Sequence, residues 1–345
     1  MAEETPAPQP FGAAVLDATI RSTPEDFVVE EILGFEPSGQ GEHLFLEIEK
    51  RGANTVWVAQ QLARWAGVPE HAVGYAGLKD RHAVTRQVFT VHVPGREAPA
   101  LETLAIEGVR ALDARRHARK LPRGALRGNR FRLILRELHG EPGEIARRLE
   151  QIAARGIPNR FGDQRFGREG GNLAAAREML AGRRVPREKR SILLSAARSE
   201  LFNRILDARI RQDAWDRALP GEILMLDGSH SVFGPETDVE SLAGRLAAFD
   251  IHPTGALWGA GEPRCTDAAR AVEDAVAAAD PELAQGLERA GLRQERRALR
   301  VPVCGLEWRM GESLLELAFE LPAGSYATAL LDVLGTVRDG SRPSA

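Results

Sequence analysis

A carboxylate between two cations lies in the glycine-containing stretch GYAGLKDRHAVTRQ, residues 74–87. Asp80 follows Lys79 and precedes Arg81, and nearby positive charge favours the ionised form of a carboxyl group. An ionised carboxylate can act as a nucleophile on an electron-poor carbon of a sugar or a base, and that reaction needs no cofactor. The alternative is an acidic residue that only solvates a surface turn. The residue types alone leave both interpretations open.

A second stretch, residues 114–136, carries arginines and a lysine every few positions and no acidic residue. Its local positive field contrasts with the net charge of −3 for the whole chain, which would ordinarily argue against a nucleic-acid partner. Glycines, Asn129 and Phe131 interrupt the run, and this mixture suits a surface that follows phosphates and stacks bases. The segment favours RNA or DNA as a partner over an ordinary solvated loop.

Other chemistries find little support in the sequence. The histidines lack metal-ligand spacing, and Cys265 and Cys304 are too few and too far apart for a metal set or a disulfide framework. The string SGQGEHL lacks the third glycine and the lysine of nucleotide-binding loops, and no GxSxG motif of serine hydrolases occurs. We therefore expect no metal and no cofactor.

The composition also bears on location. Two cysteines in 345 residues are typical of a reducing compartment. No apolar run reaches the length of a membrane span, and the acidic, proline-rich start of the sequence lacks the features of a signal peptide. We expect a cytoplasmic protein without a membrane partner. A monomer is expected because no apolar surface stripe indicates a protein partner.

The elements around these residues alternate in type. Period-two alternation predicts strands at residues 25–33, 42–50, 84–93, 129–138 and 313–321. Helical periodicity predicts helices at residues 55–67 and 142–156. Alanine-rich helical patterns then dominate up to about residue 300. The sequence predicts an α/β (α+β) protein whose discontinuous domain, residues 1–156 and 303–345, is interrupted by a mainly helical domain at 157–302.

Several longer strings match one known family. They are STPEDFVVEEILGFEPSGQGEHLFLEIEKRGANT, GYAGLKDRHAVTRQ, RKLPRGALRGNRFRLILRE, IPNRFGDQRFG, LSAARSELFNRIL and LPAGSYATALL. In this order, from about residue 20 to 335, the chain resembles the TruD family of tRNA pseudouridine synthases. The resemblance implies a pseudouridine-synthase catalytic fold with a mixed, mostly antiparallel sheet and flanking helices, interrupted by a TRUD insertion domain.

The resemblance also implies a reaction. A uridine, expected at position 13 in the D arm of certain tRNAs, would be isomerised to pseudouridine without a cofactor. The base is detached from N1, turned and rejoined through C5. The residues leave open whether the aspartate attacks the ribose C1′, attacks the uracil C6, or abstracts a ribose proton to give a glycal. The expected partner is tRNA.

Site residues are carried over by motif. Asp80 is the expected nucleophile. The expected substrate-binding residues are Phe27, Asn129, Phe131, Tyr326, Arg21 and Lys79. Tyr326 stands where a phenylalanine is usual, and Arg21 where a lysine is typical, which keeps the charge but not its point-like geometry. Aromatic platforms would offset the cost of extruding a base, and Asn129 offers the donor and the acceptor that reading a uracil edge requires.

Two other classes of protein are alternatives. A non-catalytic RNA-binding protein would keep the cleft without the chemistry, but it would not need Asp80 with its flanking cations. A hydrolase acting on a nucleoside bond would need a way to deliver water, and no second carboxylate is placed for that role. The sequence therefore favours the synthase.

Overall fold

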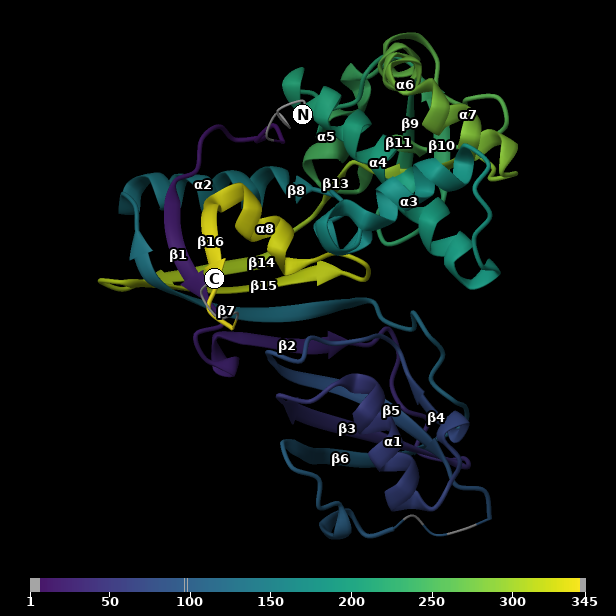
Figure 1. The fold of residues 1–345 in the computed structure, drawn as a ribbon. Helices are drawn as coiled ribbons and strands as arrows, with labels where there is room; N and C mark the ends of the chain where they lie inside the picture. Colours follow the sequence, from purple (N-terminus) through teal and green to yellow (C-terminus); the bar gives the residue numbers. More distant parts are fainter. Residues whose placement is uncertain (1–6, 96, 98, 342–345) are drawn as a thin grey trace. The chain divides into compact units, whose positions relative to one another are not determined.

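The structure is a computed structural model that describes residues 7–95, 97 and 99–341, so the predictions for residues 1–6 lie outside the described part. The chain divides into two compact units (Figure 1). Unit 1 comprises Glu150–Pro302 and Thr328–Val333 with the described residues up to Ala13. Unit 2 comprises Ala14–Leu149 and Val303–Ala327 with the described residues from Leu334 onward. The predicted domain boundaries stay a prediction.

Unit 2 is built on a ten-stranded sheet with the central order β14-β15-β7-β2-β5-β3-β6. Its strands are β1 (Leu16–Ile20), β2 (Phe27–Ile32), β3 (His43–Arg51), β4 (Val73–Tyr75), β5 (Val84–His92), β6 (Val109–His117), β7 (Gly128–His139), β14 (Cys304–Met310), β15 (Leu314–Pro322) and β16 (Gly335–Asp339). The pairings of β1 with β16 and of β2 with β5 are parallel, and the others are antiparallel. The predicted mixed, mostly antiparallel sheet is confirmed.

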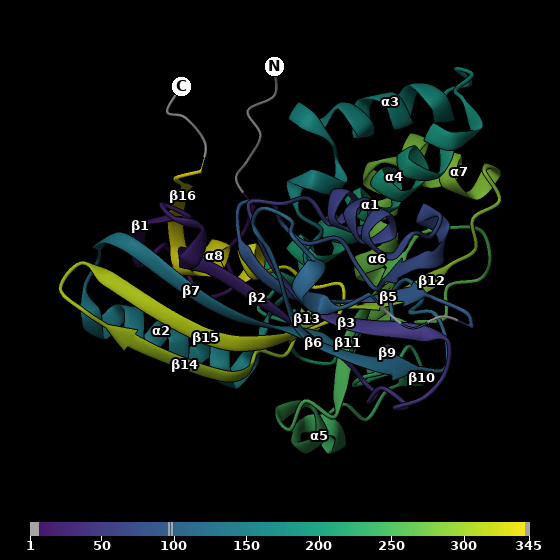
Figure 2. The ribbon, with the colours of Figure 1, turned by 90° about the horizontal axis from the view of Figure 1, so that it is seen from below.

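Helix α1 (Thr55–Ala66) covers one face of β3 and β5 (Figure 2). It begins after Asn54, whose side-chain oxygen accepts a hydrogen bond from the backbone N–H of Val56, and it ends at Gly67 in the left-handed conformation. Val58 and Leu62 are fully buried and pack against the predicted inward side chains of the two strands. The apolar side of α1 therefore forms one core with β3 and β5.

The other helices of the chain are α2 (Pro142–Arg155), α3 (Gly171–Leu180), α4 (Arg187–Arg211), α5 (Ala243–Ala247), α6 (Asp267–Ala279), α7 (Pro281–Arg289) and α8 (Ala327–Leu334). Short 3₁₀ turns occur at Pro24–Asp26, Glu70–Ala72, Leu101–Thr103, Asp163–Arg165, Arg168–Gly170 and Glu240–Leu242. None of the helices in the described part of the chain is both long and apolar enough to cross a membrane.

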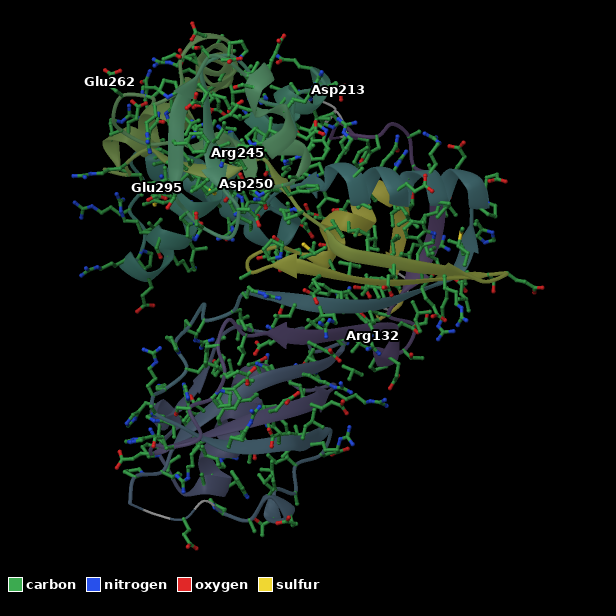
Figure 3. All side chains as sticks on the ribbon, turned by 180° about the vertical axis from the view of Figure 1, so that it is seen from behind. Arg132, Asp213, Arg245, Asp250, Glu262 and Glu295 are labelled. Carbon is green, nitrogen blue, oxygen red and sulfur yellow. The ribbon has the colours of Figure 1, made fainter. Side chains whose placement is uncertain are left out.

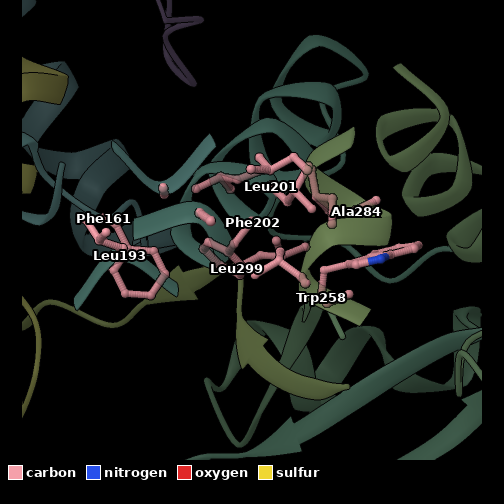
Figure 4. Packing of buried hydrophobic residues seen from close by; sticks show 14 of the residues in the cluster. Phe161, Leu193, Leu201, Phe202, Trp258, Ala284 and Leu299 are labelled. Atoms are coloured by element: carbon pink, nitrogen blue, oxygen red, sulfur yellow. The ribbon is translucent and has the colours of Figure 1, made fainter. Parts of the chain in front are cut away.

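Unit 1 contains the predicted alanine-rich helices and also a four-stranded sheet that the sequence did not predict. The sheet has the order β10-β9-β11-β12, and a separate two-stranded sheet joins β13 to β8. These strands are β8 (Ile157–Pro158), β9 (Glu222–Leu226), β10 (Val232–Glu236), β11 (Ile251–Leu257), β12 (Glu295–Ala298) and β13 (Arg300–Val301). Side chains of α4, including Leu201 and Phe202, form the core with Trp258 and Leu299 (Figure 4).

Candidate active site

One face of the unit 2 sheet carries three of the seven predicted site residues, Phe27, Asn129 and Phe131. Opposite residues of β2 and β7 include Glu31 with Asn129 and Val29 with Phe131. On β15, Phe319 is opposite Phe131. Because side chains two residues apart on a strand share a face, all of these lie on the same side of the sheet.

A buried polar strip continues this face toward the neighbouring strands. Val29 on β2 is paired with Thr85 on β5, and Thr85 is paired in turn with Lys50 on β3. Lys50, Thr85 and Gln87 are at most 1% exposed. The hydroxyl group of Thr55, the first residue of α1, donates to the side-chain oxygen of Gln87 at 3.0 Å. The strip thus ends beneath the start of the helix.

The aromatic side chains on this face pack against one another. The rings of Phe27 and Phe131 meet edge to face with centroids 6.3 Å apart, and those of Phe131 and Phe319 stack at 5.3 Å. Phe27 and Phe131 are each 5% exposed. They form a floor with a small accessible area. Because both rings are buried, replacing either by alanine would cost about 3–5 kcal/mol of folding free energy. A lower turnover of such a variant would therefore not by itself show that the ring takes part in catalysis.

Asp80 lies in the loop between β4 and β5, and its carboxylate is held from two sides. One oxygen accepts from the guanidinium Nη2 of Arg21 at 2.7 Å, and the other accepts from the backbone N–H of His82 at 2.9 Å. The Asp80 side chain is nevertheless 36% exposed. The carboxylate is therefore both oriented and accessible to a substrate.

Arg21 occupies an unusual position directly after β1. Its φ angle of 59° is in the left-handed region that residues with a side chain seldom adopt. Its guanidinium carbon lies 4.0 Å from the centroid of the Phe27 ring, and its Nη1 contacts Asp339 at 3.1 Å. Such backbone strain persists where surrounding contacts hold it, and it is common at functional sites. These contacts direct the guanidinium at Asp80.

The structure corrects the expectation about the cations that flank Asp80 in sequence. The ammonium group of Lys79 forms an ion pair with Glu31 at 2.7 Å, with side chains 8% and 1% exposed. Burial raises the pKa of Glu31, and the charge of Lys79 opposes that rise. Arg81 donates instead to the backbone oxygen of Gly52 at 3.3 Å. The guanidinium that contacts the Asp80 carboxylate belongs to Arg21.

A second buried lysine, which the sequence analysis did not identify, supports the same loop. The Lys50 ammonium donates to the backbone oxygens of Ala53 at 2.8 Å and Asp80 at 3.0 Å. Burial lowers the pKa of Lys50 to about 8, although the charge of Asp80 acts to raise it. The sequence could have identified Lys50 as a buried residue, because Lys50 continues the alternation of inward-facing residues along β3.

Replacing Lys50 by methionine should change how stability depends on pH. Between about pH 8 and the ordinary lysine value of 10.5, the unfolded chain keeps a proton that the folded chain has released. The free energy of unfolding of the wild type should therefore rise with pH across this window relative to Lys50→Met. Denaturant titrations of both proteins at about pH 7.5 and 9.5 measure the difference. A difference that is the same at both pH values would contradict the prediction.

Asn129 presents a hydrogen-bond acceptor without a partner. Among the described residues, its Oδ1 atom is buried and accepts no hydrogen bond. Buried polar atoms are nearly always satisfied, and each exception calls for an explanation. A ligand N–H group that reaches this face would satisfy the oxygen. The carboxamide is thus suited to bind a polar base edge.

Tyr326 is more exposed than the other predicted aromatic residues. It follows the end of β15 and is 39% exposed. The ring contacts that join Phe27, Phe131 and Phe319 do not extend to Tyr326 within the described part of the chain. The structure therefore brings together Arg21, Phe27 and Asp80, and places Phe131 and Asn129 on the same face.

The fold matches that of a solved protein. The crystal structure of a Methanosarcina mazei protein, described as a candidate tRNA pseudouridine synthase D (TruD), superposes with a TM-score of 0.76. The match covers 96% of each chain at 22% sequence identity. At this identity the likeness concerns the fold alone.

Sequence comparison identifies the family. The profile of tRNA pseudouridine synthase D (TruD) matches residues 12–182 and 172–333. A curated protein of that name from Xanthomonas oryzae pv. oryzae is 56% identical over 99% of this chain and 98% of its own. One from Methylococcus capsulatus is 50% identical over 94% and 92%. The chain belongs to the TruD family of tRNA pseudouridine synthases, which are isomerases. The predicted family and enzyme class are confirmed.

Proposed function

We propose that this protein isomerises a uridine of tRNA, at position 13 in the D arm, with Asp80 as the nucleophile and without a cofactor. The observation that carries the proposal is the state of the Asp80 carboxylate. It is oriented by Arg21 at 2.7 Å and still 36% exposed, in the same unit as the aromatic floor. A carboxylate that only solvated a turn would not need a strained arginine directed at it.

In the proposed reaction Asp80 acts as a charged, positioned oxygen. The bond between N1 of the uracil and C1′ of the ribose breaks, and a bond between C5 and C1′ forms. The hydrogen on C5 leaves as a proton, and N1 gains one, so the mass of the nucleotide is unchanged. Arg21 keeps the carboxylate oriented through these steps, and Asn129 binds a uracil N–H through its free oxygen. The atom that Asp80 attacks is left open, as in the sequence analysis.

The direct test is pseudouridine mapping of tRNA treated with the purified protein. Transcripts carrying uridine labelled with tritium at C5 should release the label, and carbodiimide modification should then mark a single position, 13. Release of free uracil would instead indicate a hydrolase. Tight tRNA binding without either signal would favour the non-catalytic RNA-binding protein.

The register of the sheet divides the predicted basic segment into two parts. Arg130 and Arg132 lie on the sheet face opposite to Phe131, and Arg130 is paired there with Glu320 at 2.7 Å (Arg132 is labelled in Figure 3). The loop before β7 is placed differently. Gly124 in this loop donates to the backbone oxygen of Ala76, near the start of the Asp80 loop. We propose that the loop, rather than the arginines of β7, binds phosphates.

Replacing Arg123 by glutamine should therefore reduce the salt dependence of tRNA binding. Arg123 is exposed, and its guanidinium lies 3.6 Å from the centroid of the Tyr75 ring. Loss of one phosphate contact lowers the slope of log K against log salt by about one. Filter-binding titrations at several salt concentrations measure the slope. The matched control is Arg132→Gln on the opposite face, and an equal change in both variants would refute the assignment.

We also propose that residues 1–156 with 303–345 form the catalytic domain, and that residues 157–302 form the TRUD insertion. The aromatic floor, Arg21 and Asp80 all belong to the first of these. The sequence has only two cysteines in 345 residues, which supports the proposed cytoplasmic location. A monomer is proposed, and sedimentation of the purified protein tests it.

A further inference from the structure

Leu78 is an exposed apolar side chain for which the fold gives no packing reason. It is 67% exposed, the highest value among the large hydrophobic side chains that the structure describes as exposed. It precedes Asp80 by two residues. A single exposed leucine is ordinary on a protein surface, but this one lies in the loop that carries the proposed nucleophile.

The loop that presents Leu78 is fixed on both sides of it. The backbone oxygen of Ala76 accepts from Gly124 at 2.8 Å, and the backbone N–H of Lys79 donates to the Thr55 hydroxyl at 3.0 Å. Lys50 then holds the backbone oxygen of Asp80. The exposure of Leu78 is therefore maintained by a set of anchoring hydrogen bonds.

Exposure alternates along these three residues. Leu78 and Asp80 are exposed, whereas the Lys79 side chain between them is 8% exposed and turned toward the buried Glu31. The two exposed side chains are therefore only two residues apart, on either side of a side chain that is turned into the protein. A substrate that approaches Asp80 thus meets Leu78 as well.

We propose that Leu78 enters the base stack of the tRNA and fills the space left by the extruded uridine. This inference rests on the proposed function, in which a uridine must leave its stack to reach Asp80. Proteins that unstack nucleic acid frequently insert an apolar side chain between bases, which compensates part of the lost stacking. A leucine makes no hydrogen bonds to base edges, so it acts whichever bases flank the target.

The test compares two tRNA substrates under single-turnover conditions. One is the native tRNA sequence, and the other has abasic sites on both sides of the target uridine, so that extrusion costs little. Leu78→Ala should react roughly tenfold more slowly than the wild type on the first substrate, because unstacking costs a few kcal/mol and the smaller alanine compensates less of that cost. On the second substrate the two proteins should react at similar rates. Leu78→Met, which keeps an apolar side chain of similar size, should retain most activity on both.

A second readout separates this inference from the identity of the nucleophile. A 2-aminopurine base next to the target uridine brightens when its neighbour leaves the stack. Asp80→Asn should keep this signal without forming product, whereas Leu78→Ala should weaken it. Leu226→Ala removes another exposed leucine, 37% exposed, and should change nothing. Equal slowing of Leu78→Ala on both substrates, or an undiminished 2-aminopurine signal, would overturn the proposal whatever Asp80 does.

Discussion

Changing Asp80 to asparagine should abolish pseudouridine formation and leave the affinity for tRNA nearly unchanged. The amide has the shape of the carboxylate and can still accept from the backbone N–H of His82, so the loop should keep its structure. It lacks the charged oxygen that the proposed covalent step uses. Loss of a nucleophile lowers turnover by about 10⁴-fold or more.

The measurement is tritium release from C5-labelled uridine in tRNA, with binding followed separately by filter retention. Asp339→Asn is the matched control, because Asp339 is the other carboxylate that contacts Arg21. It should reduce turnover far less than Asp80→Asn. Full turnover in Asp80→Asn would require another nucleophile and would remove Asp80 from the mechanism.

The second large effect is expected at Arg21. Replacing it by methionine removes the charge-assisted hydrogen bond to Asp80 and leaves the carboxylate free to rotate. Turnover should fall by roughly 100-fold, since a misplaced reacting group can cost about that factor. Arg21→Lys should lose less, because an ammonium group restores one charged contact but not the planar geometry of a guanidinium.

Arg81→Met gives the comparison that decides between the two views of this site. Arg81 is next to Asp80 in sequence but donates to a backbone oxygen of Gly52. Because Arg21 and not Arg81 contacts the Asp80 carboxylate, Arg81→Met should keep most of its activity while Arg21→Met should not. Steady-state kinetics should place the Arg21 effect in kcat rather than in KM. Similar losses in both variants would restore the original expectation that the sequence neighbours act on the carboxylate.

The strands that carry the core were predictable from the sequence. β3, β7 and β15 alternate apolar and polar residues over much of their length because one face is more deeply buried than the other, and this is the pattern that a period of two detects. β5 was also predicted, although both of its faces are buried from Gln87 to Val91. The strands β6 and β14 were not predicted, although Leu306, Trp308 and Met310 of β14 alternate with more exposed residues. Both strands are largely exposed or half-buried along their length and carry arginines and an acidic residue. Edge strands commonly use charge in this way.

The four-stranded sheet of unit 1 was not predicted because its central strands, β9 and β11, are buried on both faces. Four of the five residues of β9 and six of the seven of β11 are buried, so no alternation distinguishes the two faces. A short, continuously apolar segment fits a buried strand and a buried helix turn equally well. The alanine-rich segments around these strands therefore favoured the prediction of a mainly helical domain at residues 157–302.

The sequence motifs identified Asp80 as the candidate nucleophile but could not identify Arg21 as the residue that contacts its carboxylate. Arg21 and Asp80 are 59 positions apart, and only the pairing of strands brings them together. Lys79 is adjacent to Asp80 in sequence, yet its ammonium group pairs with the buried Glu31. Lys50 could have been found from the alternation along β3, but a charged residue at a buried position is the less common case.

The parallel pairing of β1 with β16 has a consequence for biosynthesis. Leu16–Ile20 lies beside Gly335–Asp339, and Arg21 and Asp339 are in contact at the end of that pair. Among the described strands of unit 2, β16 is therefore the last to be synthesised, although it pairs with the first. Because translation runs from the N-terminus, Arg21 lacks its contact with Asp339 until β16 has been made.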